Sequence, residues 1–295
     1  MHSSKKSVIN AILILLILAG VAAAYFYYQK FTAKSGKDDL NYKQTFKPED
    51  FRPLPLSPQS IKNGRTLTVP ILMYHHVGDL PKNCDSTRAD LTVPTTNFEA
   101  EVKWLKDNGY TSISLENIYL TGQGKFGLPK KPVVFTFDDG YKDVFINAVP
   151  ILKKYGFTGS FGIITKNPGT TQGTNVYASW NDIKNAQNLG NEIVSHTQNH
   201  FDGKDPKFSA GYIFKNLFGS VTDLNSRLGI TTNILIYPYG HYTVTYLEQA
   251  KKAGFVMGIT VHEGKLLDLD NLMEIPRVRV HGAETLDEFE KTITE

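Results

Sequence analysis

Short hydrophobic runs alternate with longer amphipathic stretches from Val69 to the end of the chain. The runs are rich in Val, Ile and Phe, which is typical of buried strands, and the stretches between them have helical spacing. The pattern predicts parallel strands joined by crossover helices, and about seven such units favour a distorted (β/α) barrel in the α/β class. The predicted strands are Val69–Tyr74, Tyr110–Ser114, Val133–Phe137, Thr158–Ile164, Glu192–Ser195, Ile234–Tyr237 and Phe255–Thr260; the predicted helices are Asn97–Gly109, Val144–Tyr155, Trp180–Leu189, Phe208–Leu228 and Val244–Ala253.

The amino terminus has a different hydrophobic pattern. Lys5 and Lys6 precede an apolar run, Val8–Ala24, and an aromatic cluster, Tyr25–Tyr28, follows it. This order predicts a transmembrane segment with the lysines in the cytoplasm and the tyrosines at the outer interface. We therefore expect residues 1–30 to anchor the protein in the cell membrane by a single pass, with an extracellular catalytic domain. The small residues Ala22–Ala24 also fit a cleaved signal peptide, which would make the protein secreted.

Residues 31–68 show neither helical nor strand periodicity, and they contain Pro53, Pro55 and Pro58. This composition predicts an extended spacer. Residues 69–295 then form one catalytic domain, which agrees with the length expected for a single barrel.

Charge and cysteine content exclude several classes of function. The net charge of +3 is spread along the chain without a basic cluster, so nucleic acid is not an expected partner. Cys84 is the only cysteine, which excludes an intramolecular disulfide and a thiolate metal cluster. Metal ligands would have to be His, Asp or Glu. The sequence makes no prediction about the oligomeric state.

Two carboxylates, Asp138 and Asp139, follow the predicted strand Val133–Phe137 directly. The carboxyl end of a parallel strand is the catalytic rim of a barrel. Adjacent buried carboxylates repel each other unless a cation or a shared proton relieves the repulsion. Asp-Asp-Gly alone is also a common turn.

Two histidines, His196 and His200, follow the strand Glu192–Ser195 in the same way. Their spacing brings both imidazoles to one side if the segment turns helically, although two surface histidines have the same spacing. One carboxylate and two histidines leave coordination positions open for water and substrate, as catalytic Zn²⁺ requires. Because both motifs end predicted strands, a shared metal site is the favoured interpretation.

Three segments resemble the polysaccharide deacetylases of carbohydrate esterase family 4, which contain the NodB homology domain. They are Thr136–Tyr141, His196–His200 and Tyr237–Gly240, and the resemblance extends from about Val69 to His281. The segment Leu72–His76, together with departures from the family pattern at Ile236 and at the final histidine, looks more like the poly-N-acetylglucosamine deacetylase branch than the peptidoglycan or chitin enzymes.

The resemblance implies a role for each matched residue. Asp138 would be the general base, and Asp139, His196 and His200 would bind a divalent metal, most simply Zn²⁺. The backbone amide of Tyr141 would donate to the oxyanion, while Pro238 and Tyr239 would shape the substrate groove. The implied reaction is metal-assisted removal of N-acetyl groups from an extracellular or cell-wall polysaccharide.

The sequence departs from the family pattern at two positions. The family's proton donor is typically a histidine in a final Leu-x-His segment; Val280–His281 is the candidate match, and His75, His76 and His262 compete with it. Ile236 stands where the family often has an arginine that orients the catalytic aspartate. Arg277 and Arg279, on the last strand, are predicted to supply that contact instead.

Aromatic residues near the predicted rim, Trp180, Tyr239 and Tyr242, are candidates for stacking on sugar rings. The two departures also leave two other functions open. One is a glycan-binding module without turnover, and the other is an O-acetyl esterase or amidase on the same fold.

Overall fold

The computed structural model describes residues 65–295, and their central element is a closed barrel of parallel strands. Neighbouring strands around the barrel are β2 (Ile71–Tyr74), β14 (Ile275–Arg279), β12 (Met257–Glu263), β11 (Ile234–Ile236), β10 (Glu192–Ser195), β7 (Ser160–Ile163) and β6 (Pro132–Phe137). The pairing of β6 with β2 closes the ring, and β5 (Thr111–Ser112) adds to β6. The predicted α/β barrel of about seven parallel strands is confirmed.

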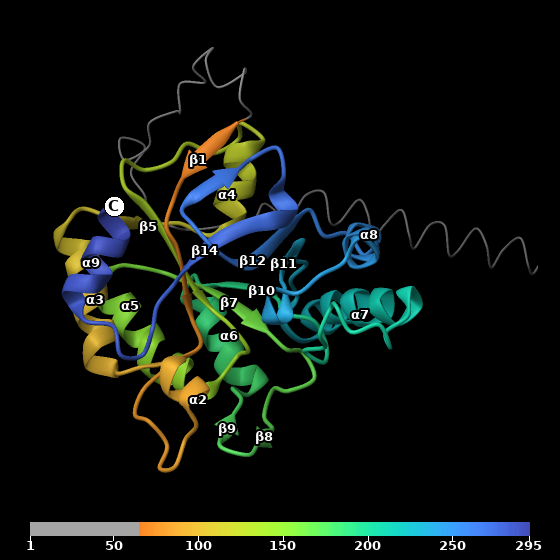
Figure 1. The fold of residues 1–295 in the computed structure, drawn as a ribbon, viewed down its shortest axis with the longest axis horizontal. Helices are drawn as coiled ribbons and strands as arrows, with labels where there is room; N and C mark the ends of the chain where they lie inside the picture. Colours follow the sequence, from red (N-terminus) through yellow and green to blue (C-terminus); the bar gives the residue numbers. More distant parts are fainter. Residues whose placement is uncertain (1–64) are drawn as a thin grey trace, which may run out of the picture. The chain divides into compact units, whose positions relative to one another are not determined.

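Helices surround the barrel in two groups (Figure 1). On one flank lie α3 (Thr95–Asp107), α5 (Val149–Tyr155) and α9 (Leu286–Thr294); on the other lie α7 (Ala210–Leu228) and α8 (Val244–Lys252). The remaining helices are α2 (Ser86–Asp90), α4 (Leu115–Gly122), α6 (Trp180–Asn188), the π-helix η2 (Val144–Ala148) and the 3₁₀ turns η3 (Pro238–Gly240) and η4 (Leu272–Glu274). Short strand pairs β3 (His76–Val77) with β4 (Thr92–Val93) and β8 (Thr171–Gln172) with β9 (Asn175–Val176) lie outside the barrel.

Alternating side chains of the strands build two hydrophobic cores. Leu72 and Phe135 pack outward against the helices, whereas their neighbours Ile71 and Val134 belong to a separate cluster. That second cluster also contains residues of α4, such as Ile118, which packs at the amino-terminal part of the strands. Both faces of the barrel strands are therefore buried, which explains their continuous hydrophobic runs.

The folded region begins before Val69. Residues Thr66–Thr68 form β1, which pairs antiparallel with β13 (Leu266–Asp268). The end of the predicted spacer therefore belongs to the domain. Residues 1–64, which contain the predicted anchor or signal peptide and most of the spacer, lie outside the described residues. Between Arg65 and Glu295, no helix combines the length and the apolar character needed to cross a membrane.

The helix predicted over Val144–Tyr155 forms, but its first part is a π-helix. Its end at Gly156 agrees with the prediction, because this glycine has a φ of 76° and caps the helix in a left-handed conformation. A π-helical segment inside a helix often lies next to a functional site. Here it begins five residues after Asp139.

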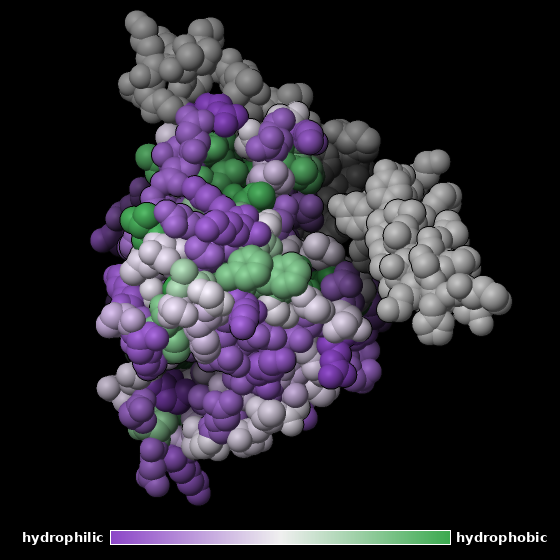
Figure 2. All heavy atoms as spheres, turned by 90° about the vertical axis from the view of Figure 1, so that its right-hand side faces the viewer, coloured by the Kyte–Doolittle hydropathy of each residue, from purple (hydrophilic) through white to green (hydrophobic). Residues whose placement is uncertain are grey.

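The outer face of α7 and α8 is turned toward the viewer in Figure 2 and is mostly hydrophilic, with a small hydrophobic patch. The large hydrophobic side chains exposed on these two helices are Tyr212, Phe218 and Val244. The buried faces of α7 and α8 pack around Tyr237 and Tyr246 in a third core cluster. The two helices are thus ordinary amphipathic helices with a solvent face.

A buried carboxyl group beside the barrel predicts a pH-dependent stability. Glu101 on α3 is 2% exposed and accepts a hydrogen bond from the Tyr74 hydroxyl at 2.8 Å. Burial raises its pKa from 4.5 to about 8. Between these two values the folded state retains a proton that the unfolded state releases, so this group's contribution to stability falls as pH rises through that window.

Glu101→Gln removes this titration and keeps the shape of the side chain. We expect the stability of the variant, relative to the unchanged protein, to increase from pH 4.5 to pH 8, as measured by urea denaturation. Glu99→Gln is the matched control on the same helix. The pKa of Glu99 is lowered by its hydrogen bond from Lys154, so this control should gain no stability in that window. A constant difference for Glu101→Gln across the window would contradict the prediction.

Candidate active site

Asp139, His196 and His200 converge at the carboxyl ends of β6 and β10. One ligand atom from each lies within 4.8 Å of the others. The Nε2 atoms of His196 and His200 stand 3.1 and 3.2 Å from Asp139 Oδ1. Ligands about 2.0–2.1 Å from a tetrahedral metal ion are separated by about 3.3–3.4 Å, so the three atoms have nearly the spacing of a coordination site.

The hydrogen bonds around these residues also fit a cation. His196 Nδ1 lies 2.8 Å from the carbonyl oxygen of Ile236, which only accepts, so Nδ1 carries the proton. In the neutral ring, Nε2 then directs a lone pair toward Asp139 Oδ1. That oxygen is buried and has no hydrogen-bond donor. A carboxylate oxygen facing two imidazoles in a buried position is the donor set that a divalent metal prefers.

Unusual backbone conformations shape the site. Asp139, Thr197, His200 and Tyr239 all have φ between 52° and 71°, and Asn83 is the one other non-glycine residue with positive φ in residues 65–295. Such conformations cost about 1–3 kcal/mol each and concentrate at functional sites. They also correct one expectation, because His196 and His200 converge through left-handed residues and not through a helical turn.

The strain at Tyr239 can be measured by substitution. Its φ is 60° and its side chain is 56% exposed, so removing the ring costs little packing. We expect Tyr239→Gly to be about 1 kcal/mol more stable than Tyr239→Ala, because only glycine adopts this conformation without steric cost.

The matched control is Glu248, an exposed residue in the middle of α8. There the order should reverse, with Glu248→Gly about 1 kcal/mol less stable than Glu248→Ala. Thermal or urea unfolding of the four variants checks both differences. Equal stability of the two Tyr239 variants would show that this backbone position carries no strain.

Asp138 lies beside the three residues and is held by Arg277. The guanidinium donates to both carboxylate oxygens, at 2.8 and 2.7 Å, and to Thr136 Oγ1 and the Thr260 carbonyl oxygen. Arg277 is completely buried. Burial by itself would raise the pKa of Asp138, but the charge and hydrogen bonds of Arg277 outweigh it and lower this pKa. Arg277 thus makes the orienting contact expected from the last strand.

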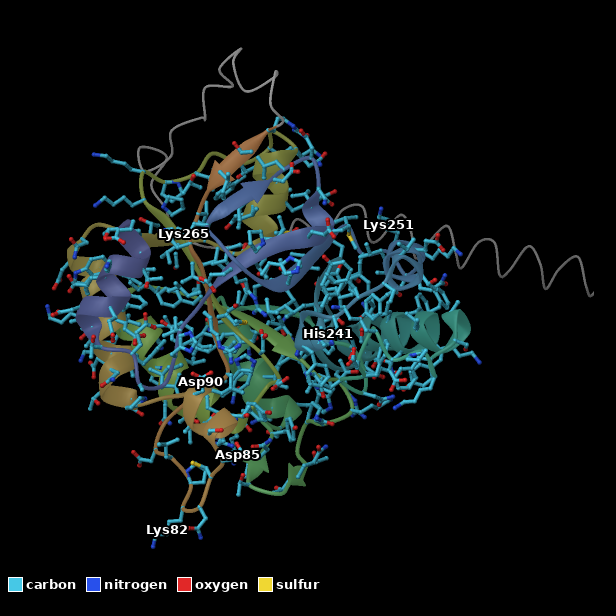
Figure 3. All side chains as sticks on the ribbon, in the orientation of Figure 1. Lys82, Asp85, Asp90, His241, Lys251 and Lys265 are labelled. Carbon is cyan, nitrogen blue, oxygen red and sulfur yellow. The ribbon has the colours of Figure 1, made fainter. Side chains whose placement is uncertain are left out.

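Arg279 does not share this role. Its guanidinium donates to Asp90 Oδ2 at 2.9 Å, and Asp90 lies at the end of α2. Arg279 is two residues further along the strand than Arg277, so it reaches the loops beyond the rim and not the barrel interior. Asp90 and His241, labelled in Figure 3, flank the middle of the barrel on different sides.

Two further groups stand at the site. His75 Nε2 is 3.9 Å from Asp138 Oδ2, and its side chain is 17% exposed. Burial lowers the pKa of His75, partly offset by Asp138 and Asp139. The buried Tyr141 lies next to Tyr177, with ring centroids 5.1 Å apart. After burial, the charge of Asp139 is the main cause that raises the pKa of Tyr141.

The candidate proton donor His281 requires a correction. Its Nδ1 pairs with Asp90 Oδ1 at 2.7 Å, and its side chain is 51% exposed. After β14 the chain turns outward toward α9, so the side chain belongs to the surface. Of the histidines that competed for this role, His75 is the one paired with Asp138.

Trp180 also requires a correction, since it was expected to stack on substrate. The residue begins α6 and is half-buried against the main hydrophobic core. The guanidinium of Arg227 on α7 lies over the ring, 5.9 Å from its centroid. Its ring therefore joins two helices. Tyr242 likewise uses its hydroxyl within the fold, donating to Glu274 at 2.7 Å.

Pro238 and Tyr239, which were expected to shape a substrate groove, differ in their exposure. Pro238 is buried at the start of η3, whereas Tyr239 projects from the surface with its ring centroid 4.6 Å from that of His200. Tyr177 was not identified from the sequence. The short strands that precede it, β8 and β9, carry mostly exposed polar residues and give no hydrophobic signal.

Comparison with known proteins identifies relatives of this barrel. The polysaccharide deacetylase family model matches residues 126–258. YxkH of Bacillus subtilis (strain 168), which is named among the polysaccharide deacetylases, is 32% identical over 228 residues, covering 75% of this chain and 74% of that protein. The poly-β-1,6-N-acetyl-D-glucosamine N-deacetylase of Staphylococcus aureus (strain MRSA252) is 31% identical over 211 residues, covering 68% of this chain and 71% of the relative.

A solved structure of a deacetylase is also similar to this chain. The Streptococcus pyogenes deacetylase PplD in complex with acetate aligns with a TM-score of 0.70 and 27% sequence identity, covering 78% of this chain and 100% of that chain. Fold, motif order and sequence identity over most of the domain agree. The chain therefore belongs to the polysaccharide deacetylase family and is a deacetylase of the hydrolase class.

Proposed function

We propose that the protein is a metal-dependent N-deacetylase of polysaccharides that contain N-acetylglucosamine. The observation that carries the proposal is the arrangement of Asp139, His196 and His200 beside Asp138, which Arg277 holds ionised. A divalent cation such as Zn²⁺ held by the three residues would supply Lewis acidity toward water and the acetyl carbonyl. Asp138 is then placed to accept the proton of the attacking water.

The chain's other groups act on the later steps. The backbone amide of Tyr141 donates to the oxygen that becomes negative during attack. His75 is close enough to Asp138 to exchange a proton through one water or a small rotation. Because its pKa is lowered, His75 is neutral at neutral pH, and it would carry to the departing amine the proton that Asp138 accepts from water.

The proton-donor assignment gives a direct prediction. His75→Ala should lower kcat by about 10²–10⁴-fold, the range for removing one general acid or base, with metal content unchanged. His281→Ala should leave kcat within about twofold, because its partner is Asp90 on the surface. Steady-state acetate release measures both. A larger loss for His281→Ala than for His75→Ala would reverse the assignment.

The substrate class rests on one relative and one surface feature. The Staphylococcus aureus relative is named for poly-β-1,6-N-acetyl-D-glucosamine. The exposed ring of Tyr239, beside His200, offers an apolar face for a sugar at the site. We propose a polymer of this kind, outside the cell or in the cell wall. Attachment to the membrane through residues 1–30 stays a prediction from the sequence.

An assay of acetate release from poly-N-acetylglucosamine, peptidoglycan and acetylated xylan tests the substrate class. We expect the first to be the best substrate, with Zn²⁺ supplied. Preference for xylan would favour an O-acetyl esterase, and binding without any release would favour a glycan-binding module. The hypothesis of a glycan-binding module arose because Ile236 stands where the family often has an arginine that orients the catalytic aspartate. In this structure Arg277 makes that contact with Asp138.

A further inference from the structure

The second histidine of the early His75–His76 pair is not used in the reaction steps above, yet it is buried beside the site. His76 is 2% exposed, and its ring is stacked on Tyr141 with centroids 3.8 Å apart and an interplanar angle of 17°. This contact joins β3 to the turn that follows Asp139. This centroid distance is shorter than the 4.5–7 Å common for aromatic pairs, so the two rings restrict each other.

A hydrogen bond to Asp143 fixes the edge of the His76 ring. His76 Nδ1 donates to Asp143 Oδ2 at 2.7 Å, and Arg88 Nη2 lies 3.7 Å from the same oxygen. Asp143 immediately precedes the π-helix η2 and is therefore anchored by it. Asp143 therefore binds one edge of the imidazole, and the face of the imidazole stacks on the ring of Tyr141.

The other side of Tyr141 is held by the β8–β9 hairpin. Asn175 Nδ2 donates to the Tyr141 hydroxyl at 3.3 Å, and Arg88 Nη1 donates to the Asn175 side-chain oxygen. The backbone of Tyr141 forms an isolated antiparallel bridge with Tyr177. Arg88 thus connects the two supports of one tyrosine. Figure 3 shows Asp85, the N-cap of α2, on the same side of the barrel as this hairpin.

The turn before Tyr141 explains why such support matters. Asp139 and Gly140 have successive φ values of 71° and 76°, so the direction of the Tyr141 amide is set by two left-handed residues. Gly140 N donates to the Asp138 carbonyl oxygen at 2.9 Å, and the Gly140 carbonyl oxygen, in the same peptide group as the Tyr141 amide, accepts from Ala178 N at 3.0 Å. A fixed tyrosine ring at the end of the turn would hold the amide in one orientation.

We propose that His76, held by Asp143, is a positioning residue that fixes Tyr141 and thereby aims its backbone amide at the developing oxyanion. The inference rests on the proposed function, in which that amide is the donor. A preorganised donor acts mainly in the transition state, and loss of one such donor costs about 10²–10³-fold in kcat. Loosening the Tyr141 amide without removing it should lower kcat by a smaller factor, about tenfold or somewhat more.

The test compares substitutions at His76 in the full-length protein. His76→Ala removes both the stacking and the Asp143 contact, and we expect kcat to fall about tenfold or more while KM and Zn²⁺ affinity stay unchanged. His76→Phe keeps a stacking ring and should recover part of kcat, and it also serves as the test if the alanine variant fails to fold. His262→Ala, an exposed histidine, is the control and should stay within about twofold.

The pH profile separates this role from proton transfer. If His76 itself were the proton donor, His76→Phe would lose as much as His76→Ala and one limb of the profile would disappear. A positioning role leaves the shape of the profile unchanged and lowers its height. Full activity of His76→Ala, or a limb lost from the pH profile of His76→Phe, would overturn the inference, whereas an inactive parent protein would overturn the proposed function instead.

Discussion

Replacing Arg277 by methionine is expected to cost about 3–5 kcal/mol of stability at neutral pH and to abolish measurable acetate release. The substitution leaves the buried carboxylate of Asp138 without its two charge-assisted hydrogen bonds, and loss of one partner of a buried ion pair has this cost. Without Arg277, burial would raise the pKa of Asp138 above its unfolded value. The destabilisation should therefore grow as pH rises above about 4.

The double variant Arg277→Met/Asp138→Asn separates stability from activity. With both charges removed, most of the lost stability should return, since paired replacement of buried charges is often close to neutral. Activity should not return, because the proposed general base is gone. Urea denaturation at pH 5 and pH 8 measures the stability of the parent and of both variants, and acetate release measures their activity. A single variant as stable as the parent at pH 8 would contradict the ion pair's role.

Replacing Asp139 by asparagine is expected to weaken Zn²⁺ binding by more than about 100-fold and to remove activity. Substitution of outer-shell partners already costs 10–100-fold in metal affinity, and Asp139 is proposed as a direct ligand. Asparagine has the same shape and tolerates the φ of 71° that Asp139 adopts. The fold should therefore be retained, which thermal unfolding without metal can verify.

Asp90→Asn is the matched control for Asp139→Asn. Asp90 also lies beyond the carboxyl end of the barrel and pairs with two basic side chains, Arg279 and His281. Its substitution should leave Zn²⁺ affinity within about twofold by isothermal titration calorimetry. If Asp139→Asn bound Zn²⁺ as tightly as the control does, the assignment of the metal site would have to be abandoned.

The barrel was readable from the sequence because parallel strands buried on both faces leave continuous hydrophobic runs, such as Val133–Phe137. Helix α4 was missed although Ser114 and Asn117 form a capping box before and within it. The short strands β8 and β9 were missed because exposed polar residues carry no periodic signal. The hydrophobic pattern of a sequence reports burial, and β8 and β9 have little of it, whereas α4 buries Leu115 and Ile118.

The site was predictable in its residues but only partly in its geometry. Asp138, Asp139 and the two histidines follow hydrophobic strands directly, so the barrel topology brings them together. Arg277 was anticipated because Ile236 left an expected charge missing. The positive φ of Thr197 was not anticipated, since β-branched residues seldom adopt such a conformation. Local strain of this kind is imposed by tertiary packing.

The proton donor shows where sequence order misleads. His281 follows the last strand, as the family pattern suggests, but it lies at the surface with Asp90. His75 is more than 200 residues away from it in sequence, yet β2 pairs with β6 and places His75 beside Asp138. Strand order around the barrel decides which histidine reaches the site, and it is not evident from the order of motifs.

The most direct test of the account is a chelation and reloading experiment on one preparation of the full-length protein. Acetate release from poly-N-acetylglucosamine is measured before chelation, after chelation, and after addition of one equivalent of Zn²⁺. We expect activity to disappear with the metal and to return on reloading, whereas Asp139→Asn stays inactive throughout. Undiminished acetate release from the metal-free protein would contradict the central claim that Asp139, His196 and His200 hold a catalytic metal.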